Sequence, residues 1–146
     1  MLVDWICLGL MSALVVDVFL GVFSRYVLHA TFQWYDEVAR LCFVWMVFLG
    51  AATAVRRGAH FRLHLLIDRF GRGARRATDL AVGLLVVGFG AVLVAGGIAL
   101  WPVARRQVSD SLELSMAWFY GALPVGGALM ILFSIPQLWR LVADRR

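Results

Sequence analysis

Asp17 is the residue whose type and position most directly suggest chemistry. It is the one charged side chain in an apolar stretch that runs from Trp5 to Phe23. A carboxyl inside a bilayer is costly unless it is protonated, paired or solvated. Asp17 could therefore bind a proton or a cation, or it could be a hydrogen-bonded carboxyl at a helix or subunit contact. Because no second ionisable residue completes a relay within the membrane, the sequence favours the structural role.

A second charged group lies where two apolar stretches end and begin. Arg25 follows the first stretch, and Asp36, Glu37 and Arg40 open the second one. Carboxylates in the first turn of a helix are favoured by the helix dipole, which explains part of this pattern. Glu37 and Arg40, one turn apart and below Trp34, continue the charge inward and favour a protein or cavity environment over lipid. We expect these four charged residues to form a paired cluster.

The histidines offer a weaker pattern. His60 and His64 stand four residues apart, a spacing that could bind a metal on one helical face. The run between them alternates polar and apolar residues, and no cysteine or third histidine lies near it. An amphipathic segment at the membrane surface is the better interpretation. Haem is not expected, because all the histidines lie at or beyond the ends of the apolar stretches.

No motif of an enzyme accompanies these residues. The chain has no nucleophile beside a base, no glycine-rich phosphate loop after a strand and no carboxylate pair in a soluble cleft. Cys7 and Cys42 form no CxxC motif and fall within apolar stretches, so we expect inert thiols. The sequence predicts a chain that is not an enzyme and has no catalytic residue, substrate-binding residue, metal or cofactor.

Four apolar stretches must position these residues. About 20 helical residues cross a bilayer, and we expect an all-α integral membrane protein with four transmembrane helices at 5–25, 34–55, 79–103 and 115–139. Hydrophobic residues make up 62% of the chain and its mean hydropathy is +0.85, which a soluble domain of this size does not tolerate. We interpret 1–146 as a single membrane domain.

The arginines predict the orientation. With four spans, one side of the membrane receives ten arginines: seven between Arg56 and Arg76, and then Arg140, Arg145 and Arg146. The other side receives four. The positive-inside rule therefore places both termini in the cytoplasm, with a short amphipathic segment between the second and third helices on the same side. The net charge of +5 indicates anionic lipid headgroups rather than nucleic acid as its partner.

Small residues predict where helices pack, because close approach of backbones replaces the hydrophobic effect in lipid. In the first span they recur every four residues together with Asp17, and in the third every seven. The members are Gly9, Ala13 and Gly21 in the first span, Gly50, Ala54 and Gly58 in the second, and Gly83, Gly90 and Gly97 in the third. Four such helices could satisfy one another as a bundle. Pro124 and Pro136 make a bend in the fourth span plausible.

Two blocks of sequence carry a family resemblance. The first comprises Arg25-Tyr26, Trp34-Tyr35-Asp36-Glu37-Val38-Ala39-Arg40, Phe43-Val44-Trp45, Phe48-Leu49-Gly50-Ala51-Ala52, and Arg57 with His60. The second comprises Ser109, Leu112, Met116-Ala117-Trp118-Phe119-Tyr120, Pro124 and Gly126. In this order they resemble the DctQ-like small permease of tripartite ATP-independent periplasmic (TRAP) transporters. Asp36 replaces the first of two family glutamates, and Glu113 and Ser115 stand where the family commonly has Gly and Pro. Asp17 is outside the family pattern.

The resemblance implies a multi-pass subunit of the bacterial inner membrane that works with partners. A large sodium-coupled subunit with an elevator motion would receive organic acids or similar solutes from a periplasmic solute-binding protein, and this chain would extend the static scaffold. Candidate residues for structure or subunit contact are Asp17, Arg25, Trp34, Asp36, Glu37, Arg40, Trp45, Gly50, Trp118 and Tyr120.

Two alternatives remain at the level of sequence. A small four-helix proton-coupled multidrug exporter would use Asp17, but such compact carriers lack the long arginine-rich loop. A quinone or respiratory-complex anchor would need histidines within the membrane. Replacement of Asp17 by Asn distinguishes the exporter from the scaffold. In an exporter it would abolish proton-coupled export, whereas in a scaffold subunit it would only perturb assembly.

Overall fold

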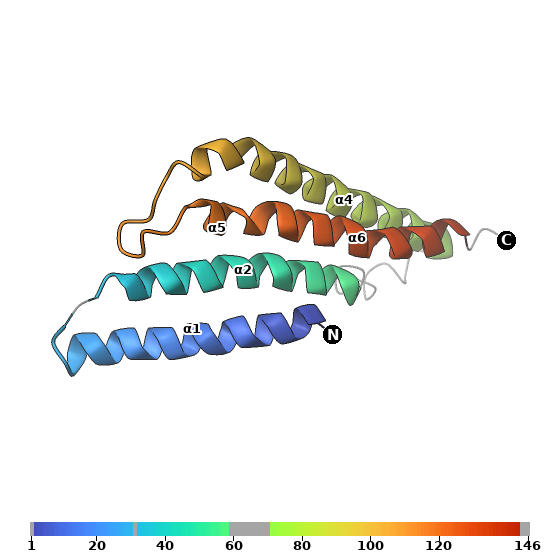
Figure 1. Ribbon diagram of the computed structural model, residues 1–146. Coiled ribbons are helices and arrows are strands. Elements are labelled where there is room, and N and C mark those ends of the chain that lie inside the picture. Colours follow the sequence, from blue (N-terminus) through green and yellow to red (C-terminus); the bar gives the residue numbers. More distant parts are fainter. Residues whose placement is uncertain (1, 31, 59–70, 144–146) are drawn as a thin grey trace.

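The computed structural model describes residues 2–30, 32–58 and 71–143 (Figure 1). These residues form α1 (Leu2–Tyr26), α2 (Trp34–Arg56), α4 (Gly71–Ala104), α5 (Ala117–Tyr120) and α6 (Ala122–Ala143). In the described ranges the β-structure is a single isolated antiparallel bridge, between Val108 and Ser115. Four segments are long and apolar enough to cross a membrane: Leu2–Tyr26, Trp34–Arg56, Arg76–Ala104 and Ala117–Leu141. The predicted four-helix membrane fold is confirmed.

The long helices lie in a row rather than in a closed bundle. α1 packs on α2, α2 on α6, and α6 on α4, as Figure 1 shows from bottom to top. Each end helix therefore has extended contact with one long neighbour. The sequence left a closed bundle possible, because helix period and small residues indicate which faces can pack; they do not require the row to close, and here it stays open. The row leaves long apolar surfaces on both of its sides.

Burial in α1 is the reverse of that in a soluble helix. Its two buried residues are Asp17 and Ser24, which are polar, whereas its large apolar side chains are exposed. Phe19, for example, is 66% exposed. Such a surface is stable only in contact with lipid or with another apolar protein face. Asp17 and Ser24 thus lie on the packed side of α1, whereas its large apolar side chains face the surroundings.

Glycines let α4 and α6 approach closely, as predicted for the third span. A methyl group added at Gly90 would lie 2.9 Å from the backbone oxygen of Gly127 and 2.9 Å from Ile131. Gly83 and Gly97 are likewise buried, against Leu138 and Pro124. On the other side of α6, Gly126 receives the Phe48 side chain from α2. Here glycine is needed for space rather than for backbone conformation.

The centre of the row has a small apolar core. Ala52 and Val55 of α2 and Met130 of α6 are buried together, and Val86 and Leu93 of α4 pack against them. In contrast, an added methyl at Gly9, Gly50 or Gly58 would meet no atom of the described residues within 4 Å. The predicted small-residue faces of the first two spans are thus only partly used inside this chain.

The fourth span loses one helical hydrogen bond near Pro124, but Gly121 keeps helical backbone angles, with φ −61° and ψ −24°, so the plausible bend stays a prediction. α5 ends at Tyr120 and α6 begins at Ala122, with Gly121 between them. Proline has no amide hydrogen, so Pro124 cannot donate the usual helical bond to the carbonyl of Tyr120. The helix continues through Pro136, which lies inside α6.

The ends of α1 and α2 fix their register. Asp4 meets Arg56 at one end, and Gly21 packs 3.4 Å from the Cβ of Tyr35 at the other. In this antiparallel register Asp17 faces α2 about one turn from Tyr35. Asp17 therefore lies in the half of α1 that ends at Tyr26 rather than at the middle of the span. The predicted amphipathic segment, with His60 and His64, falls largely outside the described residues, and the membrane orientation stays a prediction.

Replacing Gly90 by Ala tests the close packing of α4 on α6. The added methyl overlaps Gly127 and Ile131, and overpacking of this kind costs about 1–3 kcal/mol. We expect Gly90→Ala to lower the unfolding temperature in mild detergent. Gly88→Ala is the matched control, because its methyl would meet nothing within 4 Å and the gain in helix propensity is the same. Equal unfolding temperatures for the two variants would contradict this packing.

Candidate functional site

The Glu37 carboxylate joins α2 to the connection between α4 and α5. Its Oε1 accepts a hydrogen bond from the amide of Ser111 at 3.0 Å, and its Oε2 accepts one from Leu112 at 2.9 Å. Hydrogen bonds that involve an ionised group are stronger than neutral ones. One half-buried side chain thus binds two amides that are more than 70 residues away in the sequence.

The connection that Glu37 binds is a short hairpin. The amide of Ser109 donates to the carbonyl of Leu114 at 2.8 Å, and the amide of Met116 donates to the carbonyl of Gln107 at 2.9 Å. Glu113 turns the chain with a φ of 51°, in the left-handed region that favours glycine. This is the position at which the sequence departs from the family's common glycine. The hairpin retains the turn in spite of that departure.

Two further side chains of α2 contact α5. The guanidinium of Arg40 lies over the ring of Phe119, 4.8 Å from its centre. Arginine above an aromatic face gains a cation–π attraction. Five residues further along α2, the Trp45 indole Nε1 donates a hydrogen bond to the carbonyl of Trp118 at 3.0 Å. Glu37, Arg40 and Trp45 together fix α2 against the hairpin and α5, and we call this joint the outer corner.

The predicted cluster of ion pairs is not what the structure shows. Within the described ranges, the ion pairs found join Asp4 to Arg56 and Arg57, and none links Arg25, Asp36, Glu37 and Arg40. Glu37 binds backbone amides, which have no sequence signature. Arg25 and Asp36 instead line a pocket of about 220 Å³ between α1 and α2, together with Asp17. The sequence brought the right residues to one end of the molecule but paired them wrongly.

The other candidate residues lie around these two sites. Trp34 stacks on Tyr35 with ring centres 3.8 Å apart. The Trp118 side chain is 62% exposed, although its carbonyl is used by Trp45. Tyr120 is 37% exposed and lines the same pocket as Phe119. A methyl group added at Gly50 would meet none of the described atoms within 4 Å, and a role of Gly50 in contact with another subunit stays a prediction.

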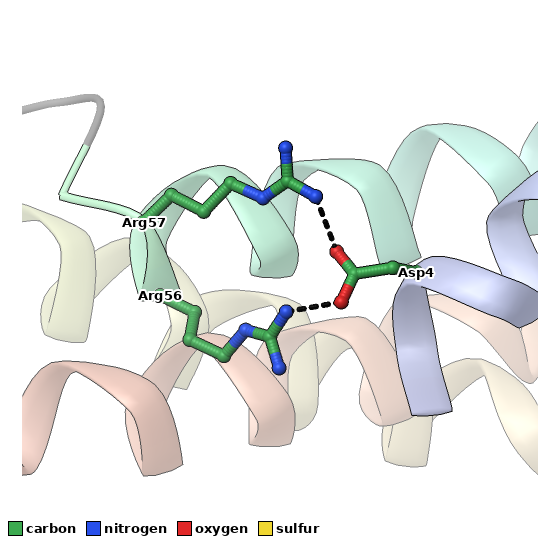
Figure 2. A network of polar contacts seen from close by, with 3 residues as sticks. All are labelled: Asp4, Arg56 and Arg57. Carbon is green, nitrogen blue, oxygen red and sulfur yellow. Dashed lines mark hydrogen bonds and ion pairs between the residues drawn. The ribbon is translucent and has the colours of Figure 1, made fainter. Parts of the chain in front are cut away.

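Sequence reasoning missed a second joint, which lies at the opposite ends of the helices from the outer corner. Asp4 receives hydrogen bonds from Arg56 and Arg57, at 2.7 Å for the latter, and Figure 2 shows its carboxylate between the two guanidinium groups. The Gln137 side chain of α6 donates to the carbonyl of Val55 at 2.6 Å. The signal was available, because Asp4 and both arginines belong to the same predicted side of the membrane.

Arg76 fastens α4 to α6 at that same end. Its guanidinium donates to the carbonyl of Leu141 at 2.5 Å. Carbonyls in the last turn of a helix lack internal partners, and a basic side chain satisfies one of them favourably. Part of the arginine-rich region therefore has structural contacts as well as its predicted role in orientation.

These polar contacts lie near the ends of the helices, on both sides of the predicted membrane, and hold the helices together. Among the described residues, no three His, Cys, Asp or Glu side chains are grouped as a metal site would require. The arrangement can join helices and bind a small charged group in the Asp17 pocket.

A family model matches residues 14–144, most of the chain, and its description is tripartite ATP-independent periplasmic transporters, DctQ component. The chain belongs to this family. This DctQ-family chain is therefore a component of a TRAP transporter, and it is a protein of the inner membrane with four spans. The resemblance drawn from the sequence is confirmed.

Named relatives agree with the family. The chain is 29% identical to the sialic acid TRAP transporter small permease protein SiaQ of Vibrio cholerae, over 94% of this chain and 79% of that protein. It is 37% identical to the C4-dicarboxylate TRAP transporter small permease protein DctQ of Rhodobacter capsulatus, over 66% of this chain and 44% of that protein. It is also 31% identical to the sialic acid TRAP transporter permease protein SiaT of Haemophilus influenzae, over 75% of this chain and 18% of that longer protein. These likenesses support the small-permease interpretation. They give no support to the multidrug exporter.

Replacing Glu37 by Gln tests the outer corner. The neutral amide keeps the size of the side chain but loses the charge and one of the two acceptor oxygens that bind the hairpin. We expect hydrogen exchange at the amides of Ser111 and Leu112 to accelerate on the order of tenfold, measured by mass spectrometry on peptides from this region. Glu113→Gln removes the same charge from the same hairpin and should leave this exchange unchanged. Unchanged exchange in Glu37→Gln would show that the carboxylate does not hold the hairpin.

Proposed function

We propose that this chain is a static scaffold subunit for a large sodium-coupled membrane subunit that takes up organic acids by an elevator motion. A periplasmic solute-binding protein would deliver the solute and contact the assembly transiently. The observation that carries the proposal is the row of four helices. Polar joints fasten the helices near both of their ends, and large apolar side chains are exposed along the row. An open row of fastened helices suits the wall of a larger assembly.

The charge distribution supports this assignment. The hydrogen-bonded charged groups lie near the ends of the helices, where Glu37 and Asp4 hold neighbouring segments in place. Asp17, whose Oδ2 has no hydrogen-bond partner among the described residues, lies instead at the α1–α2 contact. A carrier that moves its own solute needs a polar site near the bilayer midplane. The role that we propose is one of assembly and includes no catalytic step.

The relatives support a large partner and an acidic solute. SiaT contains a region similar to this chain inside a protein several times longer. Covalent linkage of the two parts in that protein suggests that the separate chains also meet. Sialic acid and C4-dicarboxylates, the solutes in the relatives' names, both carry carboxylates. We propose an organic acid for the transporter to which this chain belongs.

Co-purification tests the proposed partnership. This chain would be produced together with its large permease partner and purified in mild detergent through a tag on this chain alone. We expect the large subunit to co-elute in stoichiometric amount, because the exposed apolar faces of the row need cover. Recovery of this chain as a self-associated oligomer without the partner would contradict the proposal.

Variants of the outer corner test how the partner is held. We expect Glu37→Gln and Arg40→Ala to reduce recovery of the large subunit and solute uptake, because each loosens α2 from the hairpin or from α5. Glu113→Gln, in the same hairpin, serves as control. Wild-type recovery and uptake in both variants would show that the outer corner has no part in assembly.

A further inference from the structure

The pocket between α1 and α2 has the chemistry of a binding site that the scaffold role does not use. It has a volume of about 220 Å³, smaller than typical sites for drug-sized ligands. Asp17, Arg25 and Asp36 supply its charges. Tyr26 and Phe32, both more than half exposed, lie at its outer mouth. The pocket thus begins at the outer end of α1 and reaches down to a buried carboxyl.

Asp17 is the group that points to a ligand. It is 7% exposed, and its Oδ2 is buried without a hydrogen-bond partner in the structure. No other described contact supplies Asp17 with a donor, although it lines the pocket. An ionised carboxylate without a partner in a low-dielectric region is costly, and a donor or a positive charge in the pocket would stabilise it. Asp36, the second carboxyl of the pocket, adds to the negative potential there.

The surroundings select the class of cation. A metal ion is disfavoured, because the described lining offers two carboxylates and no third carboxylate, histidine or cysteine as a ligand. A quaternary ammonium such as choline has no N–H group to donate to Asp17. A primary ammonium carries three donors, enough to satisfy both oxygens of a carboxylate and one more acceptor. The pocket therefore matches a primary ammonium group.

The other lining residues identify what carries that ammonium. Arg25, exposed at the outer end of α1, has the geometry that suits a phosphate. Val18 and Val22, about half exposed, line the same pocket on the side of α1 that faces the surroundings. A phosphate beside a primary ammonium, with acyl chains along apolar side chains, describes one class of molecule. We propose that this pocket binds the headgroup of phosphatidylethanolamine, with its ammonium at Asp17 and Asp36 and its phosphate at Arg25.

Native mass spectrometry of the purified chain in detergent tests this assignment. Phosphatidylethanolamine, phosphatidylcholine and phosphatidylglycerol with identical acyl chains would be added at equal concentration. We expect the wild type to retain phosphatidylethanolamine about tenfold better than the other two, since only this lipid offers charged N–H donors to the carboxylates. Asp17→Asn should abolish the preference. Asp110→Asn, an exposed carboxyl on the same side of the membrane but outside the pocket, should keep it.

Two further arms keep the result decisive. If Asp17→Asn does not fold, Asp36→Asn is used instead, since this residue is exposed and its loss should also reduce the preference. Glycerophosphoethanolamine, which lacks acyl chains, should compete poorly. Equal retention of all three lipids by the wild type, a preserved preference in both carboxyl variants, or full competition by the soluble headgroup would each overturn the proposal.

Discussion

The contact of α2 with the hairpin, α5 and α6 holds the whole chain together. α1 has extended contact only with α2 among the long helices, and α4 only with α6. The two helical pairs are therefore joined along one line. In lipid the hydrophobic effect does not press helices together, so this line needs close packing and specific polar contacts. The chain supplies both, with Gly126 against Phe48 in the apolar part and polar contacts at the two ends.

The placement of the polar contacts follows from the cost of burying charge. Glu37 is close to the start of α2, and Asp4 is in the first turn of α1, so both can act near the headgroup region. Between these ends the helices meet through small and apolar residues. Helices that are fastened near both of their ends resist sliding past one another, while the row exposes apolar faces. These are the properties that a fixed wall beside a moving subunit requires.

Much of the fold could be predicted from the sequence, because its signals are local. Apolar length predicted the four spans, and the seven-residue spacing of Gly83, Gly90 and Gly97 predicted the packed face of α4. The open row could not be predicted, since the same faces also permit a closed bundle. The partners of Glu37 are backbone amides, and backbone amides look alike at every position. Asp17 was correctly placed on a packing face, but the pocket around it depends on the register set by Asp4 and Tyr35.

The central claim is that this chain keeps one shape while the transporter works. Spin labels at Leu8 in α1 and Leu85 in α4, both exposed, would report the distance between the ends of the row, after replacement of Cys7 and Cys42. The distance would be measured by double electron–electron resonance in the reconstituted complex, with and without sodium and the loaded binding protein. The scaffold account predicts superimposable distance distributions under all conditions. A second distance that appears with sodium and solute would contradict it, because the row itself would then take part in the motion.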